Sequence, residues 1–412
     1  MWIRSLRALG LRQFGENARW YLAYTFLSGL ASGVFSLFYN LYVLSLGFDR
    51  SYLGLLLAVP LVVECLFALP AGFLASRFGY RNALVVGLTA YSGAIVGLSS
   101  LPSRSGLLLF ALGLGVGQTL FDVCNAPLVA ESSTSAERTR LFSTQFAVRL
   151  FASFFGSLAA GAMPAAFARL LHVGAEAPSA YRGTLLLSAV LLLVAFLPLL
   201  RVRPRAAAPF SRPSTEHGPR STEWSTLWRL FIPQIVIGIG AGALVPFLNV
   251  FLKTRFVLSD SILGLLFALQ AIAMGVATLL GPSLAERVGR IRALVLTQVA
   301  SIPFLALLGF SPFFPLAACA FFARAGLMNM GSPLYSAFSM EQVDERHRAT
   351  ASALLVMSSQ GSRALSSWIS GILQEGPGFA PVFALTIACY LVASLLILVF
   401  FGRRPLPSAP PS

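Results

Sequence analysis

Charged residues are scarce in this chain. Of its 412 residues, 57% are hydrophobic and 11% are charged, and the mean hydropathy is +0.78. A soluble domain has about a quarter of its residues charged, because those side chains keep its surface in contact with water. This composition excludes a soluble globular protein and predicts a chain that lies in a membrane.

Cysteine and histidine are also rare, and their positions exclude several kinds of site. The four cysteines all fall inside apolar runs and no two lie close in sequence, which excludes a disulfide framework and a thiolate metal site. The three histidines fall between the apolar runs, and none belongs to a paired-histidine zinc motif. With no nucleophile–base pair either, the sequence predicts a protein that is not an enzyme and that requires no cofactor or metal.

Long apolar runs are what the chain has in abundance. A run of about 20 apolar residues spans the hydrocarbon core of a bilayer as one helix. We count twelve such runs in the sequence. They lie near residues 20–46, 52–75, 83–101, 106–130, 140–166, 183–200, 227–252, 260–284, 293–310, 313–340, 350–374 and 381–401. The sequence therefore predicts an all-α membrane protein with twelve transmembrane helices.

The basic residues are distributed unevenly. The chain has 30 basic residues against 15 acidic ones, a net charge of +15, and every basic residue except Lys253 is an arginine. Most of them lie on segments that share one side of the membrane if both termini are cytoplasmic. An excess of basic residues on short cytoplasmic loops sets the orientation of a membrane protein. The charge therefore predicts a topology, with both termini inside an inner or plasma membrane, rather than a nucleic-acid partner.

One long polar segment, Arg201–Thr226, interrupts the apolar runs. It is rich in proline, serine and arginine, a composition that does not bury a core and is typical of a linker. It leaves six apolar runs on each side. We predict an N-terminal six-helix bundle (residues 1–200), a cytoplasmic linker (201–226) and a C-terminal six-helix bundle (227–412).

The two halves of the chain repeat each other. A short segment, GFLASRFGYRNAL (Gly72–Leu84), returns 209 residues later as GPSLAERVGRIRAL (Gly281–Leu294). A second segment, ERTRLFSTQFAVR (Glu137–Arg149), matches ERHRATASALLVM (Glu345–Met357). Because both matches keep nearly the same spacing, they indicate a duplicated unit.

A third match joins residues 37–58 to residues 246–268 and places Asn40 against Asn249. Three matches in the same order are unlikely to arise by chance. A duplicated six-helix unit is the architecture of many alternating-access transporters.

This arrangement resembles the major facilitator superfamily over nearly the whole chain. The signature of that family is a Gly-x-x-x-Asp-Arg-x-Gly-Arg/Lys loop after the second helix, with a weaker copy after the eighth. Ser76 stands where the family has its acid, and Glu286 lies one place late in the second copy. The matching residues are Gly72, Ser76, Arg77, Gly79 and Arg81 in the first loop, and Gly281, Glu286, Arg287, Gly289 and Arg290 in the second.

The resemblance implies that the two bundles close against each other on the cytoplasmic side and then separate. Each signature loop then needs a glycine for its tight turn and arginines to contact an acid at the end of a neighbouring helix. The alternative is that these arginines set the topology and touch lipid phosphates. The expected contacts are Arg81 with Glu131 or Glu137, and Arg290 with Glu341 or Glu345.

Five ionisable residues lie deep inside the predicted spans. Such residues are costly in lipid unless they are paired or hydrated, so each is a candidate functional residue. In the resembled family the helices that carry them line the central cavity. They are Glu64, Asp122, Arg149, Arg324 and Arg363.

Two pairings are expected among these residues. Asp122 and Arg149 lie at similar depths on neighbouring helices and form either a structural pair or part of the transport machinery. Glu64 and Arg363 are expected to pair across the bundle interface, and Glu64 could carry a proton when that pair breaks. Arg324 has no evident partner and is expected either to meet an anionic substrate group or to donate to helix carbonyls.

Neutral polar residues accompany these charges on the same helices. They either contact a substrate in an aromatic, apolar cavity or join helices to one another. We consider Asn40 and Asn249 the strongest candidates for substrate contact, because the repeat pairs them. The set comprises Tyr39, Asn40, Gln118, Gln145, Asn249, Gln270, Asn329 and Gln360.

The leading hypothesis is a secondary active transporter that exports amphiphilic small molecules with proton coupling, as implied by a resemblance to multidrug-efflux members. The alternative is an importer or exchanger of small organic anions, since the predicted spans contain three buried arginines but only two buried acids. A transport-silent sensor or scaffold is a third possibility of a different class. The expected partners are a small-molecule substrate and membrane lipid, and the expected state is a monomer.

Overall fold

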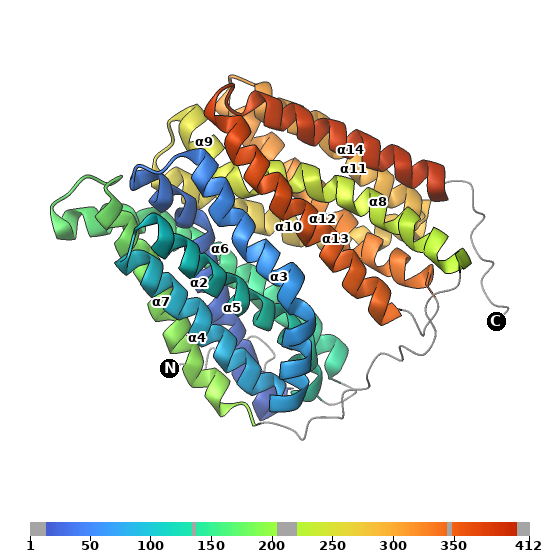
Figure 1. Cartoon of the computed structure of the whole chain (residues 1–412), viewed down its shortest axis with the longest axis horizontal. Helices are drawn as coiled ribbons and strands as arrows, with labels where there is room; N and C mark the ends of the chain where they lie inside the picture. The colour runs from blue at the N-terminus through green and yellow to red at the C-terminus, as the bar shows by residue number, and fades with distance from the viewer. Residues whose placement is uncertain (1–13, 134–136, 204–220, 344–347, 402–412) are drawn as a thin grey trace. The chain divides into compact units, whose positions relative to one another are not determined.

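The computed structural model describes residues 14–133, 137–203, 221–343 and 348–401, and these residues are helical almost throughout. Figure 1 shows the helices, coloured from blue at the N-terminus to red at the C-terminus. No strand occurs in the described ranges. The elements are α2 (Glu16–Ser45), α3 (Arg50–Phe78), α4 (Tyr80–Ser100), α5 (Arg104–Glu131), α6 (Arg138–Leu171), α7 (Pro178–Arg201), α8 (Ser221–Leu244), η2 (Val245–Phe247), α9 (Leu248–Phe256), α10 (Asp260–Val288), α11 (Arg290–Phe310), α12 (Phe314–Glu341), α13 (Arg348–Glu375) and α14 (Ala380–Phe401).

The predicted all-α architecture of twelve spans is confirmed. Helices α8 and α9 form one span, Leu227–Phe256, which is interrupted by η2 where Pro246 cannot donate a helical hydrogen bond. Ten spans are long and apolar enough to cross a membrane by length and composition. Helices α12 and α13, with 28 residues each, complete the twelve.

Part of the predicted linker segment is helical. Helix α8 begins at Ser221, so the last six residues of the segment 201–226 are helical. Residues 204–220 of that segment lie outside the described residues. The polar first turn of α8 explains the difference, because a window that looks for apolar residues does not detect it.

The helices form two compact units. Unit 1 comprises residues 1–212, 245–272 and 367–376, and unit 2 comprises residues 213–244, 273–366 and 377–412. Unit 1 thus contains the N-terminal helices together with α9, the first part of α10 and the last part of α13. The domain boundaries predicted at residues 200 and 227 remain a prediction.

Small residues let the helices of unit 1 pack closely. Helix α2 packs against α6 and α7, and α5 packs against α3 and α4. A Cβ added at Gly156 of α6 would lie 2.4 Å from the carbonyl oxygen of Leu30 on α2, so only glycine fits there. Close backbone approach of this kind is how helices associate in lipid, where apolar side chains gain little from burial.

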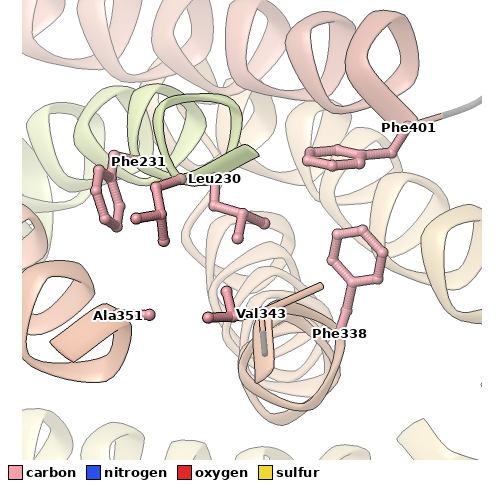
Figure 2. Close-up of a cluster of buried hydrophobic side chains, with 7 residues drawn as sticks. Leu230, Phe231, Phe338, Val343, Ala351 and Phe401 are labelled. Atoms are coloured by element: carbon pink, nitrogen blue, oxygen red, sulfur yellow. The ribbon is translucent and has the colours of Figure 1, made fainter. Parts of the chain in front are cut away.

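Unit 2 has an aromatic core between α8, α12, α13 and α14. Figure 2 shows Leu230 and Phe231 facing Val343, with the rings of Phe338 and Phe401 beside them. Those two rings meet edge to face, with centroids 4.9 Å apart. The cluster joins helices that are far apart in sequence, so it fixes the packing of this bundle.

The repeat is visible in how the second helix of each half begins. Asp49 accepts a hydrogen bond from the backbone N–H of Tyr52 at 2.6 Å at the start of α3. Ser259 accepts one from the N–H of Ile262 at 3.4 Å at the start of α10. Both are side-chain N-caps three residues ahead of the donor, and such caps satisfy one of the free amides of the first helical turn.

In each of the two signature loops, a single glycine separates two helices. Gly79 separates α3 from α4 with φ of +86°, and Gly289 separates α10 from α11 with φ of +85°. Positive φ is readily adopted by glycine alone. The two glycines therefore set the angle between consecutive helices in each half.

Candidate functional site

Two asparagines join α2 to α9 in unit 1. Asn40 donates to the side-chain oxygen of Asn249 at 2.9 Å and to the carbonyl of Pro246 at 2.6 Å. Asn249 donates in return to the carbonyl of Leu37 at 2.8 Å. Both side chains are 3% exposed. The prediction that they contact substrate is therefore corrected, because the side-chain amide of each asparagine is hydrogen-bonded to the other helix.

Two pairs of glycines bring helices of the two sequence halves into backbone contact. A Cβ added at Gly54 of α3 would lie 2.9 Å from the Cα of Gly371 on α13. A Cβ added at Gly264 of α10 would lie 2.7 Å from the Cα of Gly161 on α6. Gly264 and Gly371 each lie 210 residues after an N-terminal counterpart, Gly54 and Gly161. The two crossings are thus equivalent contacts of a duplicated unit.

A cluster of charges surrounds the single lysine of the chain. Lys253 of α9 contacts Glu176 at 3.0 Å, forms an ion pair with Asp260, and donates to the hydroxyl of Tyr181 at 2.6 Å. The side chains of Lys253 and Asp260 are 11% and 9% exposed, whereas that of Glu176 is 75% exposed. The sequence placed Lys253 in a loop, so this cluster was missed. Its residues come from both halves of the chain.

These contacts lie at the helix ends opposite to those that lead to the segment 201–226. We refer to them together as the far junction. Glycine crossings, hydrogen bonds and one ion-pair cluster make up these contacts. The far junction consists of Asn40, Gly54, Gly161, Glu176, Tyr181, Asn249, Lys253, Asp260, Gly264 and Gly371.

A cavity in unit 1 lies between α2, α4, α5 and α6. Its lining includes the aromatic residues Tyr24, Tyr91 and Phe121. It also includes leucines, two serines and the polar side chains of Gln118 and Arg149. We refer to it as the N-bundle pocket. Two residues of the predicted set, Gln118 and Arg149, are therefore brought to one site.

The predicted ion pair between Asp122 and Arg149 is not formed. Asp122 accepts a hydrogen bond from Gln118, one turn earlier on α5, at 2.8 Å. The guanidinium of Arg149 instead lies over the ring of Phe121, 5.1 Å from its centroid. Neither charged residue belongs to an ion pair with another described residue. Asp122 is hydrogen-bonded to a residue of its own helix, and Arg149 makes a cation–π contact with an aromatic ring.

Gln145 joins helices instead of lining the pocket. It is 6% exposed and donates to the side-chain oxygen of Asn125 at 3.1 Å. The same oxygen accepts from the hydroxyl of Tyr21. Asn125 therefore links α2, α5 and α6, and sequence reasoning missed it. Tyr39 is likewise a core residue, 5% exposed and stacked on Phe35.

Arg324 has a partner that the sequence did not suggest. It is 4% exposed in unit 2, and it donates to the hydroxyl of Tyr390 on α14 at 3.0 Å. Its Nε is buried and has no hydrogen-bond partner. A second cavity in unit 2 lies between α8, α11 and α12 and is lined by neutral residues such as Gln234, Gln298 and Ser336. Arg324 is not among the residues that line this cavity.

The remaining predicted residues stay candidates. Glu64 and Gln270 are half-buried in unit 1, and Gln360 and Arg363 are half-buried in unit 2. Asn329 donates to the carbonyl of Ala325 within its own helix at 3.1 Å. Because Glu64 and Arg363 belong to different units, their pairing stays a prediction.

The first signature loop makes a contact that differs from the prediction. Arg81 donates to the carbonyl oxygens of Leu199 and Leu200 at 3.3 and 2.6 Å, and not to Glu131 or Glu137. Both carbonyls lie in the last turn of α7, where Leu199 also accepts from the backbone N–H of Val202 at 3.2 Å, so the guanidinium adds a cap to the end of that helix.

The other signature positions show local contacts. Ser76 donates to the carbonyl of Phe73 at 2.8 Å, and Arg77 lies 5.9 Å from the ring centre of Phe78. In the second loop, the side chain of Glu341 and all of Glu345 lie outside the described residues, so the expected contacts of Arg290 remain a prediction.

Comparison with known proteins places the chain in a family. A family model described as the Major Facilitator Superfamily matches residues 21–233 and 230–412. No curated protein matches the chain in sequence. The two matched segments together cover nearly the whole chain and correspond to its two halves.

Several solved structures share the fold. A mutant of the nucleoside transporter NupG has 14% identity and a TM-score of 0.75, over 93% of this chain and 100% of that one. A bacterial homologue of the human lysosomal transporter Spinster, in an inward-facing and unoccupied conformation, has 17% identity and a TM-score of 0.74, over 95% and 98%. A D-xylose–proton symporter has 16% identity and a TM-score of 0.71, over 92% and 96%. With a family match over the whole chain and many apolar spans, this chain is a member of the Major Facilitator Superfamily, a multi-pass membrane transporter and not an enzyme.

Proposed function

We propose that this chain is a secondary transporter that moves an amphiphilic small molecule by alternating access, coupled to protons. The observation that carries the proposal is the far junction. Its contacts hold the ends of α9, α10 and α13 on the N-terminal helices within unit 1. Alternating access requires an element with two discrete arrangements, and we infer that this set of hydrogen bonds, ion pairs and glycine crossings forms in one of them.

The two halves contribute equivalent residues to this junction. Asn40 matches Asn249, and Gly54 matches Gly264, so the contacts have the pseudo-symmetry of the duplicated unit. In transporters built from repeats, the two bundles rock about a site near the middle of the membrane. We infer that the far junction faces outward, with both termini cytoplasmic, and that the signature loops close the opposite side in the other state.

The proton-coupling residues we propose are Asp122 and Glu64. Both carboxylates lie within membrane spans, where an ionisable side chain is costly and is a candidate functional residue. Asp122 is held by Gln118 beside the N-bundle pocket rather than by a cation. A carboxylate that is not neutralised by a fixed cation is free to exchange protons during transport.

The substrate we propose is amphiphilic, because the N-bundle pocket combines three aromatic rings with few polar groups. A second candidate, a small organic anion, is favoured by Arg149, which lines the same pocket and has no carboxylate partner. The solved structures with this fold include a proton symporter, which agrees with coupling to protons.

The test is flux in liposomes that contain the purified protein. Tetraphenylphosphonium and 2-naphthoate serve as amphiphilic probes of opposite charge, with and without an imposed proton gradient. We expect one of them to move faster when the gradient is applied. Liposomes that contain the Gly264→Val variant are the control, because its side chain cannot fit against Gly161. Equal flux in both preparations for every probe would refute the proposal.

A further inference from the structure

Among the described residues, none accepts a hydrogen bond from the guanidinium of Arg149. A guanidinium has five N–H donors, and arginine keeps its charge in proteins. The described contact of Arg149 is with the face of Phe121. A ring face attracts a cation but cannot accept five hydrogen bonds.

The carboxylate nearest in sequence to this ring does not supply the missing acceptor. Asp122 follows Phe121 directly and is bonded to Gln118 at 2.8 Å. Arg149 and Asp122 thus lie on adjacent helices with their charges in separate contacts. The side chain of Arg149 is exposed and lines the N-bundle pocket, so its N–H donors are open to an anion that enters there.

We propose that the N-bundle pocket binds the carboxylate or sulfonate of an aromatic organic anion on Arg149. This inference rests on the proposed function and names the substrate class of that transporter. A planar guanidinium binds such groups through two parallel hydrogen bonds. The anion would accept the hydrogen bonds of the Arg149 guanidinium, which Asp122 does not accept.

The remaining lining of the pocket suits the ring of such a molecule. Tyr24 and Tyr91 present aromatic surfaces. Gly87 and Gly117 let α4 and α5 approach closely beside them, since a Cβ on Gly117 would lie 2.6 Å from the Cβ of Tyr91. Aromatic faces pack well on a ring in offset or edge-on arrangements.

The second cavity provides a contrast within the same chain. Its lining, in unit 2 between α8, α11 and α12, contains glutamine, serine, threonine, tyrosine and methionine but no charged residue. Of the two cavities, the N-bundle pocket alone offers a positive charge. Recognition of the anionic group therefore belongs to the N-terminal bundle.

Binding to the purified full-length protein in lipid nanodiscs tests the inference. The probes are 2-naphthoate and its neutral amide, measured by calorimetry. We expect the wild type to bind the anion about tenfold more tightly than the amide, and Arg149→Gln to remove that difference, since the charged hydrogen bond is lost. Arg149→Lys should keep part of it, because the charge remains without the planar fork.

Arg169→Gln is the matched control, since Arg169 is an exposed arginine near the end of the same helix and away from the pocket. Asp122→Asn should strengthen anion binding, because it removes a neighbouring negative charge. If Arg149→Gln folds with the wild-type melting temperature and still prefers the anion, the inference is wrong. The same holds if the wild type binds both probes equally.

The two proposals fail in different ways. Gradient-driven flux of tetraphenylphosphonium, without preferential binding of 2-naphthoate over its amide, would support the transport proposal and refute the anion site. Arg149-dependent binding of 2-naphthoate, without flux of any probe, would support the anion site and refute the transport proposal.

Discussion

Asn40 and Asn249 exchange hydrogen bonds in a reciprocal pattern. Asn40 donates to the carbonyl three residues before Asn249, which is Pro246, and Asn249 donates to the carbonyl three residues before Asn40, which is Leu37. Equivalent helices of a duplicated unit form such a pattern when they face each other across a two-fold axis. The contact therefore links the repeat in the sequence to a specific junction in the fold.

The first prediction concerns this pair. Asn40→Ala should destabilise the protein by about 1 kcal/mol, the usual size of a polar helix–helix contact in membranes. Adding Asn249→Ala should cost little more, because the first change already breaks the exchange and residues in one network are not additive. Thermal unfolding in detergent measures both effects.

Asn82→Ala is the matched control for the asparagine pair. Asn82 donates to the carbonyl of Phe78 at an exposed helix start, far from α9 in sequence. Its loss should change stability by less than about 0.5 kcal/mol, as for most surface positions. Additive losses in the Asn40–Asn249 double variant would contradict the reciprocal contact.

The second prediction concerns the glycine crossings. Gly161→Val should keep the far junction open, because a Cβ there already lies 2.9 Å from the carbonyl of Asp260. A cysteine introduced at Ser261, which donates to the carbonyl of Gly161 in the wild type at 3.2 Å, should then react faster with a membrane-impermeant maleimide.

Gly93→Val serves as the comparison, since nothing lies within 4 Å of a Cβ at Gly93. It changes the same residue type inside a span without blocking a helix crossing. Equal labelling rates in the two variants would show that the crossing does not control access.

The third prediction concerns Lys253. Lys253→Met leaves Asp260 buried beside Tyr181 without its cation, and breaking a buried pair from one side costs about 3–5 kcal/mol. Lys253→Met combined with Asp260→Asn should recover much of that loss, because no charge is then left unpaired. Melting temperatures of the two variants give the comparison.

The exposed pair of Asp49 and Arg104 provides a scale for this measurement. Its side chains are 47% and 70% exposed and its atoms are 4.0 Å apart, so Arg104→Ala should cost less than about 1 kcal/mol. A loss in Lys253→Met no greater than in Arg104→Ala would show that the buried cluster does not stabilise the junction.

Much of the fold could be predicted from the sequence, because hydrophobicity and duplication determine it. The lengths of the apolar runs predicted the spans. The signature loops led us to expect glycines in tight turns, and Gly79 and Gly289 have positive φ between consecutive helices. The start of α8 was missed, since its first turn is polar. The break between α8 and α9 was also missed, although Pro246 marks it in the sequence.

The candidate site was harder to predict because the rotation of a helix decides which contact a polar residue makes. The repeat matched Asn40 to Asn249, but an amide that binds substrate and one that binds a helix look alike in sequence. Depth along the helices predicted that Asp122 lies near Arg149. In the structure, Gln118, one turn earlier on the same helix, donates a hydrogen bond to the Asp122 carboxylate.

Contacts between distant segments left little trace in the sequence. Tyr390, the partner of Arg324, lies 66 residues away on another helix. The Lys253 cluster had one available signal, since a single lysine among arginines stands seven residues before Asp260. A charge at the end of a span also serves topology, so that signal could not be separated from orientation.

The fourth prediction concerns the turn between α9 and α10. Val257 has φ of +51° and is 89% exposed, whereas Gly47, 210 residues earlier, has φ of +87° in the equivalent turn. A β-branched residue at positive φ is strained. Val257→Gly should raise stability by about 1 kcal/mol, since the left-handed conformation costs L-residues roughly 1–2 kcal/mol and the more flexible unfolded chain offsets part of the gain.

The reverse change gives the control for that turn. Gly47→Val should destabilise the protein, although nothing lies within 4 Å of a Cβ at Gly47, because the backbone angle alone opposes valine. Opposite signs of the two shifts in melting temperature are expected. A loss of stability in Val257→Gly would mean that the valine side chain makes a contribution larger than the strain.

The fifth prediction concerns coupling to protons. If Asp122 exchanges a proton during transport, Asp122→Asn should make the flux of a transported probe independent of the imposed pH gradient, because asparagine binds no proton in this range. Glu64→Gln tests the second carboxylate in the same way. Glu16→Gln, an exposed acid at the start of α2, is the control and should leave the gradient dependence unchanged. Gradient-driven flux that persists in the Asp122→Asn, Glu64→Gln double variant would exclude both residues as proton carriers, and coupling would then have to arise from other groups.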